Sequence, residues 1–438
     1  MSARFIFWVV VLVLGCIWMF KRPLVGVCLN MLFFPINPAM WGTGLESIRF
    51  QLIASVCLVL AYAVNRRSLF KPNSEDARPL LLLILYTLWS VVACIWAVGS
   101  VAEAWEVAFM GCKLTLFVWL IPRIVSTEKD LKIVAWAIFG IFALKAILDR
   151  WGGGYTPAGL TTGFVDGWTA MLLVVLVLVI TCSRSWWEQV AGALMIPFML
   201  DAIVFLHRRS AFAALVAGGV FLIVGAPARH RWKVISGAAA AAALFVAVLT
   251  PPEYWKWTAT ILKPGEESSA ASRFTMNEAS WAMSRDYPMG VGPGNYRYMS
   301  PQYANFPGHA ERELGKTAHN TFLAVLAERG WIGLGLWLSV VVLTWVRLFR
   351  IGRSDPKCSE FRVVLARGLC IGLLGVLPAL WTHQDDRADL LFWIVGLSVV
   401  IASLHRRSLS SEVPPNEAAD RPVKKSKTVP KPIAASHD

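Results

Sequence analysis

The chain has 438 residues, of which 56% are hydrophobic and 16% are charged, and its mean hydropathy is +0.56. A soluble globular domain does not need so many apolar residues, so the composition excludes the soluble class and predicts a polytopic integral membrane protein. The formal net charge is +14. We interpret this charge as a topology signal, and we expect no nucleic-acid partner.

Apolar segments recur along nearly the whole chain, and a helix needs about 20 such residues to cross a bilayer. They lack the alternation of polar and apolar residues that is typical of membrane β-strands, so we predict an all-α protein. The segments are 5–20, 24–36, 51–64, 79–98, 104–121, 130–148, 168–182, 190–206, 211–225, 234–250, 319–348, 364–382 and 389–404. Only Lys21-Arg22-Pro23 separates the first two, which are short, so we expect about twelve transmembrane helices.

Alternate connections between these segments are rich in Lys and Arg, which predicts that they lie in the cytoplasm. The basic residues are Arg66, Arg67, Lys71, Arg78, Arg123, Lys129, Arg184, Arg229, Arg231, Lys233, Arg347, Arg350, Arg353, Lys357, Arg362, Arg406 and Arg407. The opposite side then receives residues 37–49, 98–103, 149–167, 207–210, 251–318 and 382–388.

This pattern divides the chain into four parts. Residues 1–250 form N-terminal transmembrane helices, 251–318 a large outer loop, and 319–407 C-terminal transmembrane helices. Residues 408–438 contain few apolar residues and several lysines, so we expect a disordered, basic cytoplasmic tail that contacts membrane lipids.

The turn His207-Arg208-Arg209-Ser210 places two arginines on the outer side, against the usual charge bias. The arginines either extend to lipid phosphates or form an anion clamp, because a guanidinium binds phosphate through two parallel hydrogen bonds and keeps its charge. We favour the clamp.

Arg273 is a second anion-binding candidate, followed at helical spacing by Asn277 and Trp281, with Arg285 one turn further on. A loop arginine is often merely solvated, so both interpretations stay open. The segment 288–294 that follows contains two prolines and three glycines, which predicts a tight irregular turn. It lacks the strand and helix that flank a nucleotide-binding loop.

His319 lies where the outer loop enters a long apolar helix that begins near Asn320. A lone histidine is often a structural residue. This one lies at a helix N-terminus, which favours bound anions and a neutral imidazole, and a neutral imidazole can accept a proton from a sugar hydroxyl.

Lys113 and Lys145 lie inside predicted spans, where an ionisable group is a functional candidate. Lys145 is close enough to the outer end to reach it. Each of the two lysines binds either a lipid phosphate or an internal carboxylate such as Asp201, Glu103 or Glu106.

Metal binding is not expected. None of the eight cysteines has the spacing of a zinc or iron–sulfur site, and none lies in the segment 251–318. Asp385, Asp386 and Asp389 lie near His383, but no second ligand motif points to them.

The second half of the chain resembles the O-antigen ligase and polysaccharide polymerase superfamily of bacterial inner-membrane proteins. The residues that carry this resemblance are Arg273, Trp281, Pro288, Gly290, Gly292, Gly294, Ala318, His319, Asn320, Leu323, Glu328, Gly330 and Gly333. Arg209-Ser210-Ala211 is similar to a turn of the family in which Arg208 replaces the usual Ser. The loop Gly152–Tyr155 resembles that of the ligases associated with exosortase systems.

The resemblance implies a glycosyltransferase C-like fold with one large periplasmic loop, in the bacterial inner membrane. The implied reaction transfers a glycan from undecaprenyl pyrophosphate to an acceptor on the periplasmic face, without a cofactor or metal and with inversion. Arg209 and Arg273 would bind the pyrophosphate, with Arg208 as a weaker partner, and His319 would activate or orient the acceptor. Other predicted substrate-binding residues are Arg285, Asn320, Trp281 and Lys113.

Three acceptors fit this chemistry: lipid A-core in an O-antigen ligase, a growing glycan in a polymerase, and a protein side chain in a protein O-oligosaccharyltransferase. We favour the ligase because the chain has a single large outer loop, whereas many polymerases have two. A lipid-linked glycan transporter is the alternative of another class. It would predict internal repeats and polar residues spread through the midplane, and neither is evident.

Overall fold

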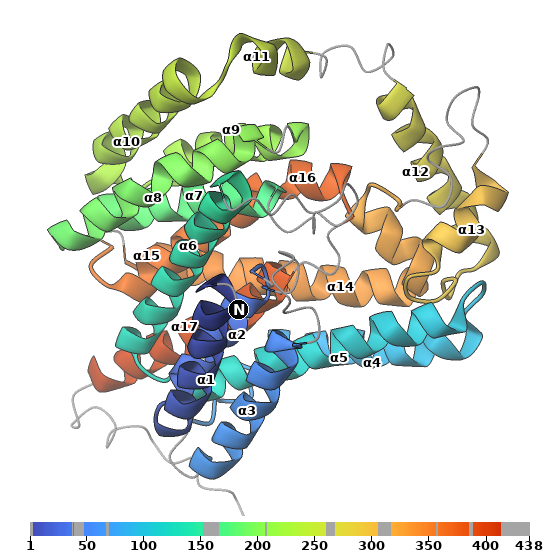
Figure 1. The fold of residues 1–438 in the computed structure, drawn as a ribbon, viewed down its shortest axis with the longest axis horizontal. Coiled ribbons are helices and arrows are strands. Elements are labelled where there is room, and N and C mark those ends of the chain that lie inside the picture. Colours follow the sequence, from blue (N-terminus) through green and yellow to red (C-terminus); the bar gives the residue numbers. More distant parts are fainter. Residues whose placement is uncertain are drawn as a thin grey trace, which may run out of the picture.

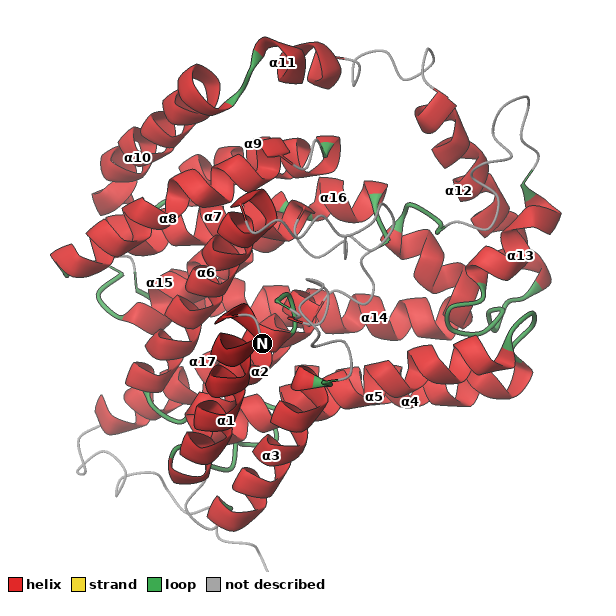
Figure 2. Ribbon diagram, in the orientation of Figure 1, coloured by secondary structure: helices red, strands yellow, loops and turns green. Residues whose placement is uncertain are grey.

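The structure is a computed structural model that describes residues 3–36, 38, 48–66, 70–151, 166–205, 208–259, 268–304, 317–355, 358–384 and 389–412. Within these ranges all regular structure is helical, and no strand occurs (Figures 1 and 2). The all-α class predicted from the sequence is confirmed.

Ten α-helices precede residue 250 in the part of the chain that is described. They are α1 (Ala3–Lys21), α2 (Pro23–Phe33), α3 (Phe50–Asn65), α4 (Arg78–Val92), α5 (Val101–Ile124), α6 (Glu128–Trp151), α7 (Asp166–Cys182), α8 (Trp186–Phe205), α9 (Arg209–Gly225) and α10 (Arg231–Leu244). Short 3-10 turns η2 (Ala93–Trp96) and η3 (Ala228–His230) and a π turn η4 (Phe245–Leu249) extend α4 and flank α10.

The described remainder contains α11 (Pro252–Ala259), α12 (Ser268–Asp286), α13 (Tyr296–Tyr303), α14 (Thr321–Ser354), α15 (Phe361–Gly375), α16 (Leu377–Thr382) and α17 (Asp389–Glu412). Helices α11 to α13 lie within the segment that the sequence predicts as a large outer loop. Helix α17 continues past residue 408, the predicted start of the tail, and residues 413–438 lie outside the described ranges.

Eight helical segments of the described chain are long and apolar enough to cross a membrane. They are Arg78–Trp96, Val101–Ile124, Glu128–Arg150, Trp186–Phe205, Ala228–Leu249, Thr321–Ser354, Phe361–Thr382 and Asp389–Ser410. Shorter apolar helices are Phe5–Lys21, Pro23–Phe33, Phe50–Asn65, Gly167–Cys182 and Arg209–Gly225. Every predicted apolar segment coincides with one of these helices, so the chain is a multi-pass membrane protein.

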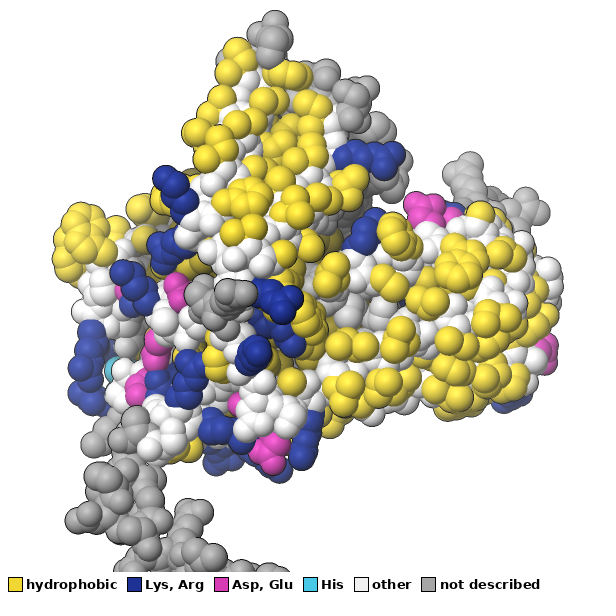
Figure 3. All heavy atoms as spheres, turned by 90° about the horizontal axis from the view of Figure 1, so that it is seen from below, with side chains coloured by type: hydrophobic (Ala, Val, Ile, Leu, Met, Phe, Trp, Pro, Cys, Tyr) yellow, Lys and Arg dark blue, Asp and Glu magenta, His cyan; other side chains and the backbone are white. Residues whose placement is uncertain are grey.

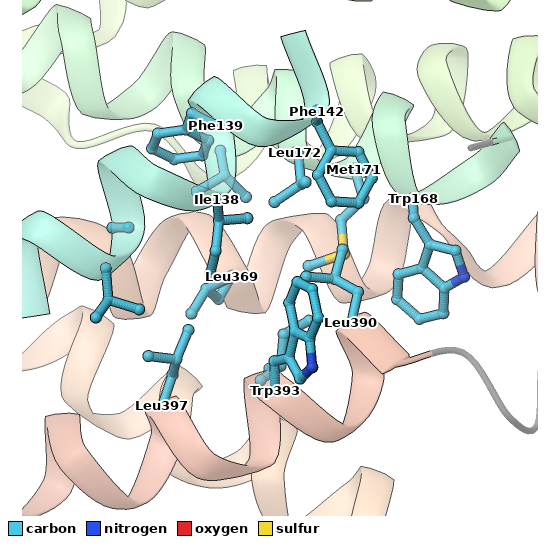
Figure 4. Close-up of a cluster of buried hydrophobic side chains, with 14 of the residues drawn as sticks. Ile138, Phe139, Phe142, Trp168, Met171, Leu172, Leu369, Leu390, Trp393 and Leu397 are labelled. Carbon is cyan, nitrogen blue, oxygen red and sulfur yellow. The ribbon is translucent and has the colours of Figure 1, made fainter. Parts of the chain in front are cut away.

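The core of the helical bundle surrounds α7, which is buried along almost its whole length. A helix that is apolar on all sides is stable only when other helices surround it or it faces lipid. In Figure 4, side chains of α6, α7, α15 and α17 meet in one cluster. Small residues allow close approach elsewhere, because a Cβ on Gly375 of α15 would lie 2.6 Å from the Cα of Gly218 in α9.

Charge is distributed unevenly between the two ends of the bundle. In Figure 3, Lys and Arg gather at the left, whereas the right part of this face is mostly hydrophobic. Helices α12 and α13 lie at the right in Figure 1. At the basic end Arg406 pairs with Glu75 (2.8 Å) and Asp76 (2.9 Å), which joins the end of α17 to the connection before α4.

Helix α14 is broken at Gly330, whose φ of 66° and ψ of −171° are not helical. The break removes helical hydrogen bonds, and buried backbone groups must then find other partners. The glycine-rich turn provides them. The amides of Val291 and Gly292 donate to the carbonyls of Ala327 and Glu328, both at 2.9 Å, and the Trp331 amide donates to the Pro288 carbonyl at 3.1 Å.

We call this exchange between residues 288–292 and 327–331 the backbone clasp. It requires glycine on both sides. A Cβ on Gly330 would lie 2.3 Å from the Pro288 carbonyl oxygen, and a Cβ on Gly290, whose φ is 86°, would lie 2.5 Å from the Glu328 carbonyl oxygen. The irregular turn predicted from the sequence is confirmed, and its partner is the break in α14.

We predict that Gly330→Ala lowers the stability of the protein, because its backbone conformation is nearly exclusive to glycine and the new methyl group collides with residue 288. The strain alone is about 1–3 kcal/mol. Thermal unfolding in detergent, followed by tryptophan fluorescence, measures the effect. The control is Gly335→Ala in the same helix, where no atom lies within 4 Å of the added Cβ. An equal Tm for both variants would contradict the clasp.

Candidate functional site

His319 lies directly before α14 in an unusual backbone conformation. Its φ is 51°, and Cys358 is the only other non-glycine residue in the described chain with a positive φ. Such conformations are uncommon outside glycine and concentrate at functional sites. Asn320 follows as the N-cap of α14, and its side-chain oxygen accepts a hydrogen bond from the Leu323 amide at 3.1 Å.

A second histidine, His383, faces His319. The ring centroids are 6.2 Å apart and the rings are nearly perpendicular, at 81°. Two hydrogen bonds tie the segment after α16 to the start of α14. The Thr321 hydroxyl donates to the His383 carbonyl at 2.7 Å, and the Ala318 amide donates to the side-chain oxygen of Gln384 at 3.3 Å.

Two arginines from distant parts of the chain act on His383. Burial, and then the positive charges of Arg208, His319 and Arg273, lower the pKa of His383 from 6.5 to about 4. Arg208 precedes α9 and Arg273 belongs to α12, whereas His383 follows α16. In Figure 1, α16 lies between the start of α9 and α14, with α12 further to the right. We call Arg208, Arg273, His319 and His383 the histidine–arginine cluster.

Arg208 and Arg209 occupy different positions. Arg208 is the N-cap residue of α9, and Arg209 is its first helical residue. The sequence favours Arg209 as the pyrophosphate ligand and Arg208 as a weaker partner, whereas in the structure it is Arg208 whose charge acts on His383. His207, from the same turn, and the Gly152–Tyr155 loop lie outside the described residues.

Trp281 and Arg285 lie on another part of α12. The centroids of the Trp281 and Trp331 rings are 5.8 Å apart, and the Arg285 guanidinium lies 5.9 Å from the Trp281 ring centroid. Arg285 is about 18 Å further along the helix axis than Arg273, at about 1.5 Å per residue. The structure therefore does not bring Arg285 to His383, and a role in substrate binding stays a prediction for both residues.

Asn320 directly follows His319 but serves as a helix cap, and Lys113 lines a different part of the molecule. The side chain of Asn320 is fully buried, and its contact with Leu323 is that of a helix cap. Lys113 lines a groove of about 660 Å³ between α3 and α5. Glu103, one carboxylate considered as its partner, pairs instead with Arg297 at 2.7 Å. Substrate binding by Asn320 and Lys113 stays a prediction.

The surroundings of His383 disfavour a metal cation, because arginine charges act on it. Asp389 is buried at the start of α17 and lines a small cavity with Arg329, while Asp385 and Asp386 lie outside the described residues. Within the described chain, no three His, Cys, Asp or Glu side chains form a group that could hold a metal.

His383 and Gln384 are the residues that reasoning from the sequence missed, since His383 was considered only as a metal ligand. One signal could have found them. The topology places 382–388 on the same side as His319 and the two arginine segments, so these polar residues can meet.

The histidine–arginine cluster is suited to bind an anion beside a group that can accept a proton. Helices α9 and α14 both present their N-termini, with partial positive charge, at this end. Arg208 and Arg273 add two permanent positive charges. Since the pKa of His383 is about 4, its imidazole is neutral at pH 7.

Residues 194–338 match the sequence profile of the family described as O-antigen ligase. The match covers roughly one third of the chain and includes Arg208, Arg209, Arg273 and His319. It confirms the resemblance to the O-antigen ligase-like superfamily and supports a function of the ligase or polymerase type. No curated protein matches the chain.

We predict that His383 makes the protein less stable in acid. Above pH 6.5 its imidazole is neutral whether the chain is folded or unfolded, so it contributes nothing. Below pH 6.5 the unfolded chain binds the proton first, because the folded pKa is about 4. The stability lost between pH 6.5 and 4 is about 3 kcal/mol. In thermal unfolding from pH 7 to pH 4, His383→Asn should flatten the decline in Tm, and an unchanged decline would refute a buried, neutral His383.

We predict that Arg208→Gln also flattens this decline, because removing a nearby positive charge raises the pKa of His383 towards its ordinary value. Arg209→Gln is the matched control one residue away. The same pH series of melting temperatures measures both variants. A larger effect of Arg209→Gln would show that Arg209, and not Arg208, faces the histidines.

Proposed function

We propose that the O-antigen ligase-like chain described here transfers a glycan from undecaprenyl pyrophosphate to an acceptor hydroxyl on the periplasmic face of the bacterial inner membrane. The observation that carries the proposal is the histidine–arginine cluster. It combines permanent positive charge, two helix N-termini and two imidazoles, at the end of the bundle away from the basic connections.

The donor needs a cationic site. A glycosyl pyrophosphate reacts by breaking the bond between the anomeric carbon and the pyrophosphate oxygen, and negative charge then develops on the departing lipid pyrophosphate. Arg208 and Arg273 bind this charge, with Arg209 at the start of the same helix. Charge-assisted hydrogen bonds from fixed donors are strongest where water is excluded. The positive charge of the arginines can therefore serve the departure of the pyrophosphate without a metal or cofactor.

The acceptor needs a proton acceptor. Its hydroxyl oxygen forms the new bond to the anomeric carbon from the side opposite the leaving group, which inverts that carbon, and its proton passes to an imidazole. We assign this role to His319. The negative pyrophosphate offsets the arginine charges that oppose protonation of His383. The histidine pair can therefore hold a proton more readily once the donor is bound.

Among acceptors we favour lipid A-core, so the proposed enzyme is an O-antigen ligase. A single extended segment, with α11, α12 and α13 in its described part, joins the two sets of apolar helices. A polymerase or a protein O-oligosaccharyltransferase would use the same cluster with another acceptor. A transporter would place polar residues across the midplane, whereas the cluster gathers them at one end.

We predict that His319→Ala and Arg273→Ala each lower glycan transfer by at least about 100-fold, the usual contribution of a general base or of one charge-stabilising donor. Each variant is expressed in a strain that lacks the gene. Lipopolysaccharide is then analysed on a gel and carrier-linked glycan is quantified. Arg184→Ala is the control, because it removes an exposed arginine from the connection between α7 and α8, at the basic end. Equal membrane levels are required for all variants.

Loss of the whole high-molecular-weight ladder, with carrier-linked glycan accumulating, supports the ligase. A single capped repeat instead indicates a polymerase. An unchanged ladder in the deletion strain would refute both lipopolysaccharide functions and favour a protein acceptor, another polysaccharide or transport.

A further inference from the structure

A polar hollow of about 150 Å³ borders the two segments that carry the histidine pair. Thr317, two residues before His319, lines it, and so does Gln384, directly after His383. The Ala318 amide donates to the Gln384 side chain at 3.3 Å, so the wall of the hollow is attached to the backbone next to His319. The hollow has room for several water molecules, and hence for the hydroxyl-bearing edge of a sugar.

The hollow contains two carboxylates. Glu103 and Glu328 line it, and each is paired with an arginine. Glu103 lies 2.7 Å from Arg297, and Glu328 lies 3.2 Å from Arg329. The two pairs leave no net charge, so the hollow does not attract a pyrophosphate.

Its side chains suit neutral hydroxyl groups. A carboxylate accepts about four hydrogen bonds, and an amide both donates and accepts. Glu103 keeps about a fifth of its side chain exposed, at 21%, beside its ion pair with Arg297. Gln384 presents an amide whose nitrogen lies 3.5 Å from Glu328 Oε1. A sugar offers several hydroxyls at fixed positions, each of which donates and accepts.

Close backbone packing and hydrogen bonds fix the positions of the residues that line the hollow. A Cβ on Gly294, whose φ is 76°, would lie 3.0 Å from the Cγ of Glu103, so the glycine lets the turn pack directly on this carboxylate. Tyr296 is buried and its hydroxyl donates to the Met276 carbonyl at 2.8 Å, which makes it part of the wall. The backbone clasp holds the same turn against Glu328. A hollow with fixed walls can orient a ligand.

We propose that this hollow is the acceptor subsite and that it binds the hydroxyl groups of a neutral sugar through Glu103 and Gln384, with the buried Glu328 holding the Gln384 amide. This inference rests on the proposed glycan transfer. The two substrates are then separated by charge. The donor pyrophosphate lies with Arg208 and Arg273, and the acceptor sugar lies with the paired carboxylates, next to the segments that carry His319 and His383. Gln384 contacts the sugar, and through the Ala318 amide it also positions the backbone next to His319.

The test compares the KM for acceptor with the KM for donor in the purified full-length protein in detergent. The donor is lipid-linked glycan, and the acceptor is lipid A-core, both extracted from a strain that lacks the gene. We expect Gln384→Ala and Glu103→Gln each to raise the KM for acceptor about tenfold, which corresponds to the loss of one or two hydrogen bonds. The KM for donor should stay within about twofold.

Two controls accompany these variants. Gln189→Ala removes an exposed glutamine at the start of α8, on the basic side, and should leave both constants unchanged. Arg273→Ala should mainly raise the KM for donor and change the KM for acceptor much less. Because Gln384 helps to hold the segment before α14, the Tm of each variant is compared with the wild type, and the near-isosteric Glu103→Gln keeps the test valid if Gln384→Ala is unstable.

Equal changes in both constants, or an unchanged KM for acceptor in stable variants, would overturn the acceptor subsite while leaving the proposed transfer intact. Wild-type transfer onto a Ser- and Thr-containing peptide but not onto lipid A-core would overturn the sugar assignment. A wild-type protein that transfers to neither acceptor would overturn the proposed function itself, and the inference with it.

Discussion

The exchange of backbone hydrogen bonds at Gly330 positions the rest of the functional end of this protein. A membrane helix normally satisfies its own backbone, so a break inside α14 requires partners from elsewhere. The turn 288–292 supplies them, and this joins a segment otherwise outside the bundle to one of its longest helices. The three glycines of the turn and Gly330 all adopt positive φ, which explains why these positions need glycine.

A small second core extends from the backbone clasp towards the histidines. Met276 and Met283 of α12 pack with Val291 of the turn and with Ala318 and Ala324 near the start of α14. Arg273 lies one turn before Met276, so the packing that anchors α12 also holds this arginine near His319. Clasp, core and cluster therefore depend on one another.

Electrostatics divides this end of the molecule into two regions. Burial, and then the positive charges of Arg208, His319 and Arg273, lower the pKa of His383 to about 4. In the hollow each carboxylate has its own arginine, and the region is nearly neutral. Two substrates of different charge could be sorted by such a division before any specific contact forms. Proton transfer would then occur at the boundary, where both substrates meet an imidazole.

Several features followed from the sequence alone because they depend on local patterns. Hydrophobic length located the apolar helices of the described chain, the alternation of basic connections predicted a basic and a polar end, and the glycines of 288–294 predicted an irregular turn. His319 was found because it precedes a long apolar helix. Only the tertiary structure could decide which residues accompany it. His383 and Arg208 come from segments far from His319 in the chain. Arg285 is only twelve residues from Arg273, but it lies about 18 Å further along α12. Proximity of this kind depends on how helices pack against one another, and the hydrophobic pattern that predicts each helix contains no information about which neighbour it will meet.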